Sequence, residues 1–320
     1  MKRIGVLTSG GDCSGMNACL RAVVRTAVFR KKEVIGIIRG YEGLINGEFK
    51  PLTSRDVSGI VNLGGTILKT ARSKRFLTKE GRKRAYEVLK ENNIEGLVVI
   101  GGDGSFRGAD IFGKEFNFPV VGIPATIDND IVGTDLTLGA DTAVNVALDC
   151  IDKIRDTATS LERIFVIEVM GRNCGYIALE TALAGGCEEA VIPEKNYDID
   201  KMCHRIVEGN LRGKISWIIV VAEGAGKAED IARKINKKTS LEVRVTVLGH
   251  IQRGGRPTLK DRILGAKFGN FAVELLLQGK RGVCVGIQSE KLVAMSFKSA
   301  VDNKKWLDVE PYFRLIKILT

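Results

Sequence analysis

The sequence predicts an α/β protein built on mostly parallel sheets. Three observations lead to this class: short β-branched runs without polar alternation, a polar or glycine-containing turn after each run, and a helical pattern after most turns. Continuous apolar strands separated by helices are typical of a parallel sheet that is covered on both faces. Ligands of such sheets bind beyond the carboxyl ends of the strands, so we expect the chemically active residues in these turns.

Each expected strand is an apolar run that stops at a turn. In chain order the runs are Arg3–Ser9, Glu95–Ile100, Pro119–Ile123, Arg163–Met170, Ser216–Ala222 and Arg244–Leu248. Apolar residues at helical spacing follow the first run over Asn17–Phe29 and the fourth over Ile177–Ala184. Glycine suits the turns because it lets the backbone reverse tightly. The repeated unit suggests an old duplication.

The composition fits a globular chain of one large domain or two moderate ones. The 320 residues are 44% hydrophobic and 27% charged, which excludes collagen-like, disordered and coiled-coil classes. No apolar run approaches the roughly 18 residues of a membrane span. The basic start, Met1–Arg3, precedes too short an apolar stretch for a signal peptide. We therefore expect a cytoplasmic protein with no membrane partner.

Cysteine and histidine usage argues against disulfides and zinc. The seven cysteines include no Cys-x-x-Cys pair, so we expect reduced thiols that fill small apolar sites. They are Cys13, Cys19, Cys150, Cys174, Cys187, Cys203 and Cys284. The histidines, His204 and His250, have no plausible zinc ligands beside them. We expect His204 on a helix surface.

The formal net charge of +11 indicates anionic ligands. Lysine and arginine cluster at Arg30–Lys32, Arg72–Arg75, Arg82–Arg84 and Lys234–Lys238. Nucleic-acid binding usually comes with a recognisable module or interleaved aromatic residues, and aromatic residues are only 6% here. We predict that most of these charges, Arg82–Arg84 among them, lie on solvated helix faces. The excess would attract small phosphate-bearing ligands rather than nucleic acid.

Two glycine-rich turns are candidates for phosphate binding. Gly10–Gly15 has P-loop spacing but lacks the Lys-Ser/Thr pair, so it is either an anion site at a helix N-terminus or an ordinary tight turn. In Gly101–Ser105, the glycines would let the backbone approach phosphates while Asp103 offers one carboxylate. Nucleotide-bound magnesium often has only one or two protein carboxylates. Asp103 is therefore either a metal ligand or a helix cap.

The segment Thr126–Asp130 carries two aspartates. In an extended stretch, Asp128 and Asp130 would share one side with Thr126, and Ile127 would pack behind. Two carboxylates so close repel each other unless a cation or a substrate proton lies between them. One could then accept a hydroxyl proton while the other helps to hold a metal. A calcium-type loop is the alternative, although acidic residues do not continue past Asp130.

Five arginines complete the candidate residues, and all but the first lie on or just past expected strands. They are Arg72, Arg163, Arg172, Arg244 and Arg253. Planar guanidinium groups suit bidentate phosphate binding, and several together indicate a multiply phosphorylated site. Taken singly, each is more often part of a surface salt bridge. His250 is either a ligand of a sugar or phosphate, or a buried, hydrogen-bonded histidine.

Five segments together resemble the bacterial ATP-dependent 6-phosphofructokinase family. In the family's order they are Leu7–Asn17, Val99–Ser105, Pro124–Asp130, Glu168–Arg172 and Gly249–Gly255. The resemblance implies transfer of the γ-phosphoryl of ATP to the 1-hydroxyl of fructose 6-phosphate, the committed step of glycolysis, with Mg²⁺ as cofactor. It implies two Rossmann-like three-layer lobes with mostly parallel sheets. The larger, ATP-binding lobe would hold residues 1–139 and 252–302, and the smaller, fructose 6-phosphate-binding lobe residues 140–251 and 303–320.

The resemblance also implies roles, motif by motif. Asp128 would be the general base and Asp103 the magnesium ligand. The other catalytic residues would be Thr126, Asp130, Arg72 and Arg172. ATP would be held by Gly11, Arg72, Ser73, Gly102, Asp103, Gly104 and Ser105. Fructose 6-phosphate would be held by Thr126, Ile127, Asp128, Arg163, Met170, Gly171, Arg172, Glu223, Arg244, His250, Ile251, Gln252 and Arg253. Arg163 and Arg244 would come from the neighbouring subunit, which implies a homotetramer.

An effector site is implied as well, for ADP or GDP as activator and phosphoenolpyruvate as inhibitor. The matching residues are Arg21, Arg25, Arg155, Gly186, Glu188, Arg212 and Lys214. Ser54 and Gly59 stand where the family has Arg and Asp. Losing one phosphate contact would cost about 1–3 kcal/mol of effector affinity, unless Arg55 substitutes for it.

Within the resemblance, ATP is favoured over pyrophosphate as the phosphoryl donor. Pyrophosphate users have a second Asp in the magnesium turn and a Lys before the catalytic Thr, where this chain has Gly104 and Ala125. The alternatives are a pyrophosphate-dependent phosphofructokinase, an NAD or lipid kinase with the same Gly-Gly-Asp-Gly turn, and a non-catalytic sugar or nucleotide sensor. The Thr126–Asp130 motif and the arginine set argue against the NAD or lipid kinase, and a sensor would have no use for paired carboxylates beside a magnesium turn.

Overall fold

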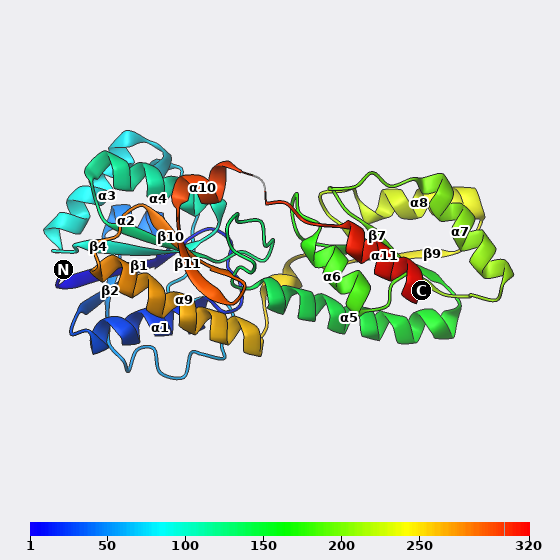
Figure 1. Cartoon of the computed structure of the whole chain (residues 1–320), viewed down its shortest axis with the longest axis horizontal. Helices are drawn as coiled ribbons and strands as arrows, with labels where there is room; N and C mark the ends of the chain where they lie inside the picture. The colour runs from blue at the N-terminus through cyan, green and yellow to red at the C-terminus, as the bar shows by residue number, and fades with distance from the viewer. Residues whose placement is uncertain (304) are drawn as a thin grey trace. The chain divides into compact units, whose positions relative to one another are not determined.

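The computed structural model describes residues 1–303 and 305–320. Residues 1–142 and 253–305 form one compact unit, and residues 143–252 and 306–320 form a second. Each unit has its own sheet with helices packed on it, so the predicted α/β class is confirmed (Figure 1). Within the described ranges, no helix is both long and apolar enough to cross a bilayer.

The first unit contains a seven-stranded sheet in the order β11-β10-β5-β4-β1-β2-β3. Its five inner strands are parallel, and the edge strands β3 and β11 are antiparallel to their neighbours. The strands are β1 Arg3–Thr8, β2 Glu33–Ile37, β3 Phe49–Leu52, β4 Gly96–Gly101, β5 Val120–Pro124, β10 Val283–Gln288 and β11 Lys291–Ser296. The chain order reverses between β1 and β4, which is where open parallel sheets bind ligands.

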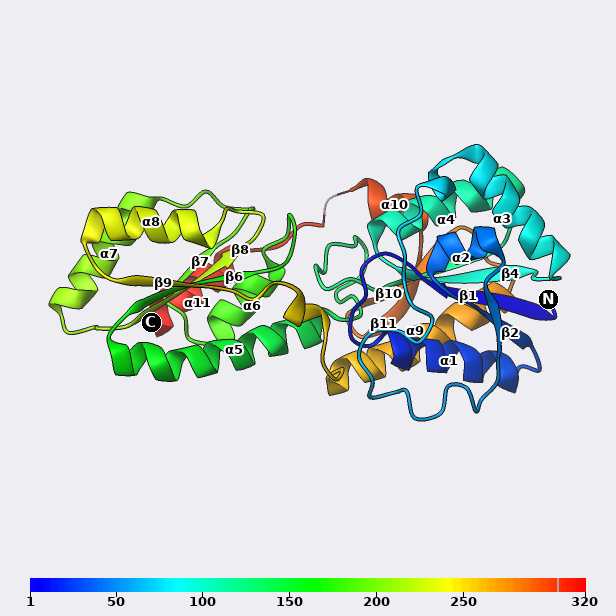
Figure 2. The same ribbon diagram turned by 180° about the vertical axis from the view of Figure 1, so that it is seen from behind.

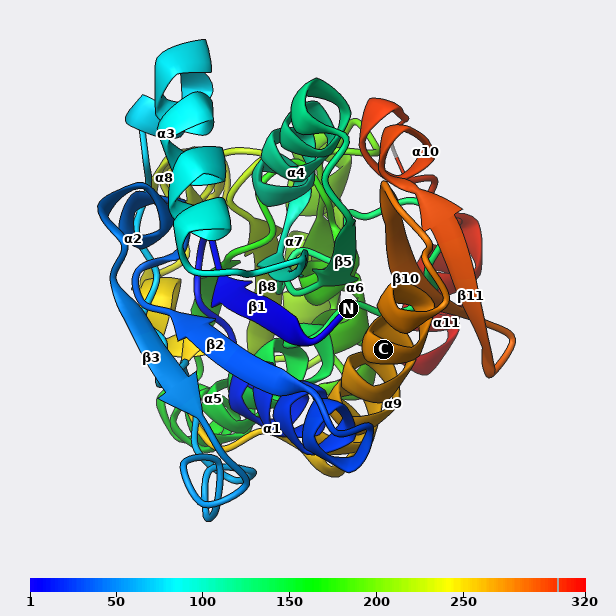
Figure 3. The same cartoon turned by 90° about the vertical axis from the view of Figure 1, so that its left-hand side faces the viewer.

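Helices cover both faces of this sheet. α1 and α9 pack together on one face, and α3, α4 and α10 lie on the other, with α2 beside α3 (Figures 1 and 3). They are α1 Met16–Phe29, α2 Gly40–Asn46, α3 Lys79–Glu91, α4 Asp103–Phe116, α9 Leu259–Leu277 and α10 Phe297–Asp302, with a 3-10 turn, η1, at Arg75–Leu77. Gly122 of β5 allows close packing, because a Cβ there would lie 2.5 and 2.7 Å from the rings of Phe297 and Phe106.

The second unit contains a four-stranded parallel sheet in the order β7-β8-β6-β9. α7 and α8 lie along one face, α5 and α6 along the other, and α11 packs on α6 (Figures 1 and 2). The strands are β6 Ile164–Val169, β7 Glu189–Val191, β8 Trp217–Ala222 and β9 Val243–Val247. The helices are α5 Ala140–Leu161, α6 Tyr176–Ala184, α7 Ile199–Leu211, α8 Ala228–Thr239 and α11 Glu310–Leu319, and a 3-10 turn, η2, spans Gly249–Arg253.

All six predicted strands are present, as β1, β4, β5, β6, β8 and β9, and the two predicted helices are α1 and α6. Within the residues that the structure describes, five further strands lie outside the predicted runs. β7 has only three residues, and β3 contains Pro51, which lacks the N–H of a ladder donor. β2 and β10 are interrupted by Gly36 and Gly286, which weakens the apolar pattern.

The prediction that Arg82 lies on a solvated helix face is wrong. Its side chain is only 10% exposed and forms an ion pair with Glu115. Nε and Nη2 donate to the two carboxylate oxygens at 2.6 and 2.8 Å, and Nη1 donates to the Leu77 carbonyl at 2.7 Å. Arg84 is 49% exposed, and His204 on α7 is 75% exposed, as predicted.

Six of the seven cysteines are buried, as predicted. Burial raises the pKa of Cys187 and of Cys284 to about 12. These side chains therefore stay protonated at neutral pH and pack as small apolar groups.

Candidate active site

The two glycine-rich turns lie side by side at the point where the strand order reverses. Gly10 follows β1, Gly101 ends β4, and the two strands are parallel neighbours. The Ser9 N–H donates to the Ile100 carbonyl at 2.9 Å, which ties the strand ends together. A Cβ on Gly101 would lie 2.6 Å from the Ser9 carbonyl oxygen, so the close approach requires glycine.

The Gly101–Ser105 turn presents a carboxylate at the start of α4. Asp103 is the first residue of the helix, and Gly102 occupies the N-cap position, so the helix-cap alternative for Asp103 is wrong. The Asp103 side chain is 38% exposed and pairs with Arg107, one turn further along α4. Open space lies beside Gly104, where an added Cβ would meet nothing within 4 Å.

The turn after β5 lies against the turn after β4. Gly101 of β4 is in register with Pro124 of β5, and a Cβ on Gly102 would lie 3.5 Å from the Cβ of Thr126. Since the two strands are parallel neighbours, Asp103 and Asp128 follow adjacent strand ends in the same unit.

The segment Thr126–Asp130 is a turn, so the extended geometry expected for it is wrong. The Asp128 N–H donates to Thr126 Oγ1 at 3.2 Å, and Asn129 has a φ of 50°. Ile127 is buried, as expected, and Asp128 is only 3% exposed. The tight turn, rather than alternation along a strand, therefore sets the directions of the two aspartates.

Asn129 fixes this turn, a role that the sequence analysis did not predict. Its Oδ1 accepts the Thr137 N–H at 3.1 Å, and its Nδ2 donates to the Asp135 carbonyl at 3.1 Å. Thr137 Oγ1 in turn donates to the Thr126 carbonyl at 2.6 Å. Asparagine tolerates a left-handed conformation, and its position between two aspartates is the only signal that the sequence offers.

Tyr41 also supports the Gly101–Ser105 turn and was not predicted. Its hydroxyl donates to the Ser105 carbonyl at 2.6 Å, and its ring stacks on Phe76 with centroids 3.9 Å apart. The neighbouring Ser73 donates to Glu42 of α2 at 2.5 Å, and this hydrogen bond is the main reason why the pKa of Glu42 is lowered. The segment that contains Arg72 is thereby held against α2.

Arg253 lies against the first glycine turn. Its Nη1 donates to the Asp12 carbonyl at 3.1 Å. A Cβ on Gly11 would lie 2.3 Å from the same Nη1, so only glycine leaves room for the guanidinium. Ser14 adds a hydrogen bond of 2.8 Å to the Gly255 carbonyl. The structure thus brings together Gly11 and Arg253, which are far apart in the sequence.

In the second unit, the predicted sugar ligands gather at the carboxyl end of β6. Glu223 Oε1 accepts the Gly171 and Arg172 N–H groups at 3.3 and 2.9 Å. Gln252 is buried, and its side chain bridges the Met170 N–H at 3.4 Å and the Gly249 carbonyl at 3.1 Å.

His250 and Ile251, which belong to the same predicted set, are exposed. The alternative of a buried His250 is therefore wrong. The side chain remains accessible to a sugar or phosphate ligand.

Arg163 and Arg244 lie at the other end of the same sheet. Arg163 precedes β6 by one residue, and Arg244 is the second residue of β9. Both pair with Glu242. Because β6 has six residues, at about 3.3 Å each, roughly 20 Å of strand separates this pair from Met170–Arg172. Within one chain, the structure does not bring the two groups together.

The predicted effector residues fall into two groups, one in each unit. In the second unit, Arg155 donates to the Gly186 carbonyl at 2.8 Å, and Lys214 pairs with Glu188 at 3.0 Å. Glu188, Arg212 and Lys214 line a cavity of about 600 Å³. Arg21 and Arg25 belong to α1 of the first unit.

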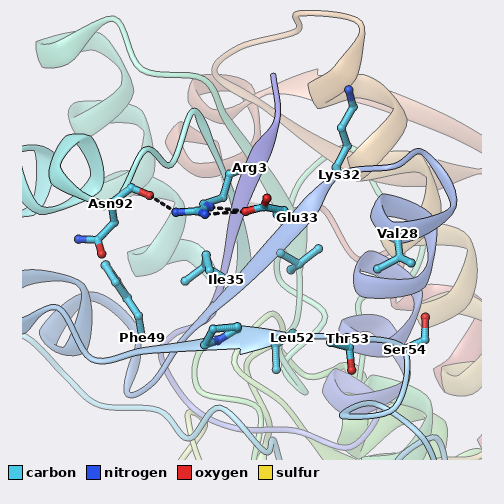
Figure 4. A pocket seen from close by; sticks show the side chains of 12 residues that line it. Arg3, Val28, Lys32, Glu33, Ile35, Phe49, Leu52, Thr53, Ser54 and Asn92 are labelled. Atoms are coloured by element: carbon cyan, nitrogen blue, oxygen red, sulfur yellow. Dashed lines mark hydrogen bonds and ion pairs between the residues drawn. The ribbon is translucent and has the colours of Figure 1, made fainter.

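A separate cavity of about 630 Å³ lies in the first unit, at the amino-terminal ends of β1 and β2 and beside β3, away from the carboxyl ends of the parallel strands (Figure 4). It adjoins the first residues of β1 and β2, where Arg3 donates to Glu33 and to the Asn92 carbonyl, each at 2.7 Å. None of the predicted catalytic, ATP-binding or sugar-binding residues lines it, although Ser54 does. The candidate active site is therefore assigned to the carboxyl ends of the strands.

Comparisons with known proteins identify the family of this chain. A family model described as phosphofructokinase matches residues 3–276. The chain belongs to the phosphofructokinase family. The family predicted from the five motifs is thus confirmed. Curated family members named ATP-dependent 6-phosphofructokinase include one from Bacillus pumilus, 56% identical over 312 residues and 98% of both chains. Another, from Clostridium tetani, is 53% identical over 320 residues and the whole of both chains.

Solved structures of the family confirm the predicted fold. Phosphofructokinase from Saccharomyces cerevisiae is 35% identical, with a TM-score of 0.89 over 100% of this chain and 46% of the yeast chain. This chain thus spans less than half the length of the yeast chain. A pyrophosphate-dependent phosphofructokinase from Marinobacter aquaeolei has a TM-score of 0.86 over 100% of this chain and 91% of its own. At 22% identity it supports the fold alone.

Proposed function

We propose that this chain transfers the γ-phosphoryl of ATP to the 1-hydroxyl of fructose 6-phosphate, giving fructose 1,6-bisphosphate and ADP. The observation that carries the proposal is the adjacency of the Gly101–Ser105 and Thr126–Asp130 turns after the parallel neighbours β4 and β5. One turn offers a carboxylate and open space for a nucleotide, and the other offers a second carboxylate for the acceptor. The names of the bacterial relatives support the same activity.

Asp128 is assigned as the general base. It would accept the proton of the sugar 1-hydroxyl as that oxygen attacks the γ-phosphorus and the bond to the β-phosphate oxygen of ATP breaks. Asp128 is only 3% exposed, and the hydrogen bonds from its own N–H to Thr126 Oγ1 and from the Thr137 N–H to Asn129 Oδ1 would hold the turn, and with it the carboxylate, in place. Asp130 would assist Asp103 in holding magnesium, and Thr126, Arg72 and Arg172 would contact the transferring group or offset its charge.

Gly11, Arg72, Ser73 and the Gly102–Ser105 turn are assigned to ATP. The residues present fit magnesium, since a half-exposed carboxylate at Asp103 is the hard oxygen ligand that this ion prefers. Among the described residues, no group of three or more acidic, His or Cys side chains could hold a metal alone, so nucleotide phosphates would supply the other ligands. Bound there, Mg²⁺ would neutralise charge on the β- and γ-phosphates.

The second unit is assigned to the sugar phosphate. Met170, Gly171, Arg172 and Glu223 would contact the sugar. His250, Ile251, Gln252 and Arg253 would bind near its 6-phosphate. Arg163 and Arg244 are assigned to the sugar phosphate of a neighbouring subunit, which is supported by their separation from Met170–Arg172 along β6. This assignment requires more than one subunit, and we propose the cytoplasmic homotetramer that the family resemblance implies.

The effector residues are assigned to ADP or GDP as activator and phosphoenolpyruvate as inhibitor. Arg155, Arg212 and Lys214 would bind the phosphates, and Glu188 an accompanying cation. Serine at position 54 would weaken this binding relative to arginine, because one charge-assisted contact is lost.

One coupled assay tests the proposed activity. Purified protein is given fructose 6-phosphate with either ATP or pyrophosphate, with and without ADP, and separately NAD with ATP. We expect turnover with ATP only, because the space at Gly104 suits the inner phosphates of a nucleotide and Ala125 offers no cation for pyrophosphate. Turnover with pyrophosphate alone, or phosphorylation of NAD alone, would overturn the proposal.

A further inference from the structure

The proposed metal ligand already has a cationic partner in the structure. Arg107 lies one turn after Asp103 on α4, and its Nε donates to Asp103 Oδ1 at 3.0 Å. The two side chains are 51% and 38% exposed. Guanidinium and a divalent cation bind the same carboxylate oxygens, so the two compete for this group.

Arg107 is also held from a second element. Its Nη2 donates to the Val301 carbonyl, and its Nη1 lies 3.6 Å from Asp302 Oδ1, both at the end of α10. α4 and α10 pack together on the same face of the sheet (Figures 1 and 3). The guanidinium thus has acceptors on both helices, whereas an ordinary surface pair on one helix has a single acceptor. This arrangement keeps positive charge beside Asp103.

We propose that Arg107 is a positioning residue that weakens the hold of Asp103 on a divalent cation, so that the metal enters and leaves with the nucleotide. This inference rests on the proposed function, in which Asp103 is the metal ligand. Arg107 occupies Oδ1, so that only Oδ2 would remain for a metal, and its positive charge reduces the negative potential at this carboxylate. Nucleotide phosphates must then complete the coordination of the ion.

The test measures binding rather than turnover. Calorimetric titration with AMP-PNP, with and without Mn²⁺, gives the factor by which the metal tightens nucleotide binding. Arg107→Met should raise that factor by roughly 2- to 5-fold, the range expected when a partly exposed ion pair no longer competes. The lost charge by itself weakens binding of the free nucleotide more than binding of its less negative metal complex, so Arg107→Met is also measured in an Asp103→Asn background, where only this general effect remains and the factor should rise less. A merely structural role would lower the factor, so an unchanged or lower factor would overturn the inference.

Two controls complete the experiment. Lys114→Met removes a cation that pairs with Asp110 four residues earlier on the same helix, and it should leave the factor unchanged. Arg107→Lys keeps the positive charge, so the factor by which Mn²⁺ tightens nucleotide binding should stay within about twofold of the value for the parent protein.

Asp103→Asn separates the two proposals. If it leaves the metal-dependent factor at the parent value, Asp103 is not the ligand and the metal assignment fails. If it lowers the factor while Arg107→Met changes nothing, only the inference about Arg107 fails.

Discussion

Arg163 and Arg244 lie at the same ends of the neighbouring strands β6 and β9, and their guanidinium groups pair with one carboxylate, that of Glu242. Two cations and one anion leave a net positive charge at this edge of the second unit. That charge suits a phosphate, as the proposed function requires.

Replacing Arg244 by serine should therefore raise the half-saturating concentration of fructose 6-phosphate by roughly 10- to 100-fold, the size of a lost charge-assisted contact. Steady-state kinetics measure this value. Arg233→Ser is the matched control, since Arg233 is 77% exposed on α8 and pairs with Asp230. An Arg244 variant that behaves like the Arg233 variant would remove Arg244 from the sugar site.

Asp128→Asn should lower turnover by about two to four orders of magnitude, because the amide cannot accept the hydroxyl proton. The affinities for ATP and fructose 6-phosphate should change little, since asparagine has the same shape. Initial-rate and binding measurements separate the two effects. Asp149→Asn, at a 65% exposed position of α5, should retain normal turnover. Near-normal turnover of the Asp128 variant would refute its role as the base.

Asp261→Asn should destabilise the first unit by about 2–4 kcal/mol. The Asp261 side chain is fully buried, and its two oxygens accept the N–H groups of Gly139 and Thr142 at 2.8 and 2.9 Å. The amide nitrogen of asparagine would face one of these donors and leave it unsatisfied. Urea denaturation gives the difference in unfolding free energy, with Asp230→Asn on the exposed face of α8 as the control. A loss no larger than that of the control would contradict this prediction.

The contribution of Asp261 should also depend on pH. Burial raises the pKa of this carboxyl above its ordinary value of 3.8, although three hydrogen bonds oppose the shift. At pH values between 3.8 and the raised pKa, the Asp261 carboxyl is protonated in the folded chain and ionised in the unfolded chain. The stability advantage over Asp261→Asn should therefore grow as the pH falls through this window. If the difference in unfolding free energy between the parent protein and Asp261→Asn shrinks as the pH falls, the predicted direction of the pH dependence is wrong.

Arg82→Ala should destabilise the protein by about 3 kcal/mol, because it leaves Glu115 and the Leu77 carbonyl without their buried donor. Arg84→Ala, two residues further along α3, should cost less than about 0.5 kcal/mol, because Arg84 is 49% exposed. Thermal unfolding followed by circular dichroism compares the two variants. Equal losses would show that the Arg82 head group is effectively solvated.

The buried parallel strands could be predicted because each is an uninterrupted apolar run with a turn after it. β3 could not, since Pro51 and its edge position remove that pattern. The burial of Arg82 could not be predicted from the sequence either. Arg82 stands beside two other basic residues on a helix, and nothing in that pattern indicates an ion pair with Glu115, 33 residues away.

The local geometry around the candidate site residues could not be predicted from the sequence. The motifs placed Asp103 and Asp128 just past two expected strands, and the structure shows that these strands are parallel neighbours. The motifs did not indicate the left-handed Asn129, whose conformation depends on Thr137 and Asp135. Tyr41 carries no motif, and its hydrogen bond to Ser105 exists only because α2 packs beside the turn.

The buried thiols can report on local unfolding of the protein, because they react with alkylating reagents only when they become exposed. A thiol with a pKa of about 12, as at Cys187 and Cys284, offers alkylating reagents almost no thiolate until its surroundings come apart. Cys284 belongs to the first unit and Cys187 to the second, so the labelling rates at these two positions would time the opening of each unit separately. A bound ligand that steadies only one unit would slow only one of the two rates.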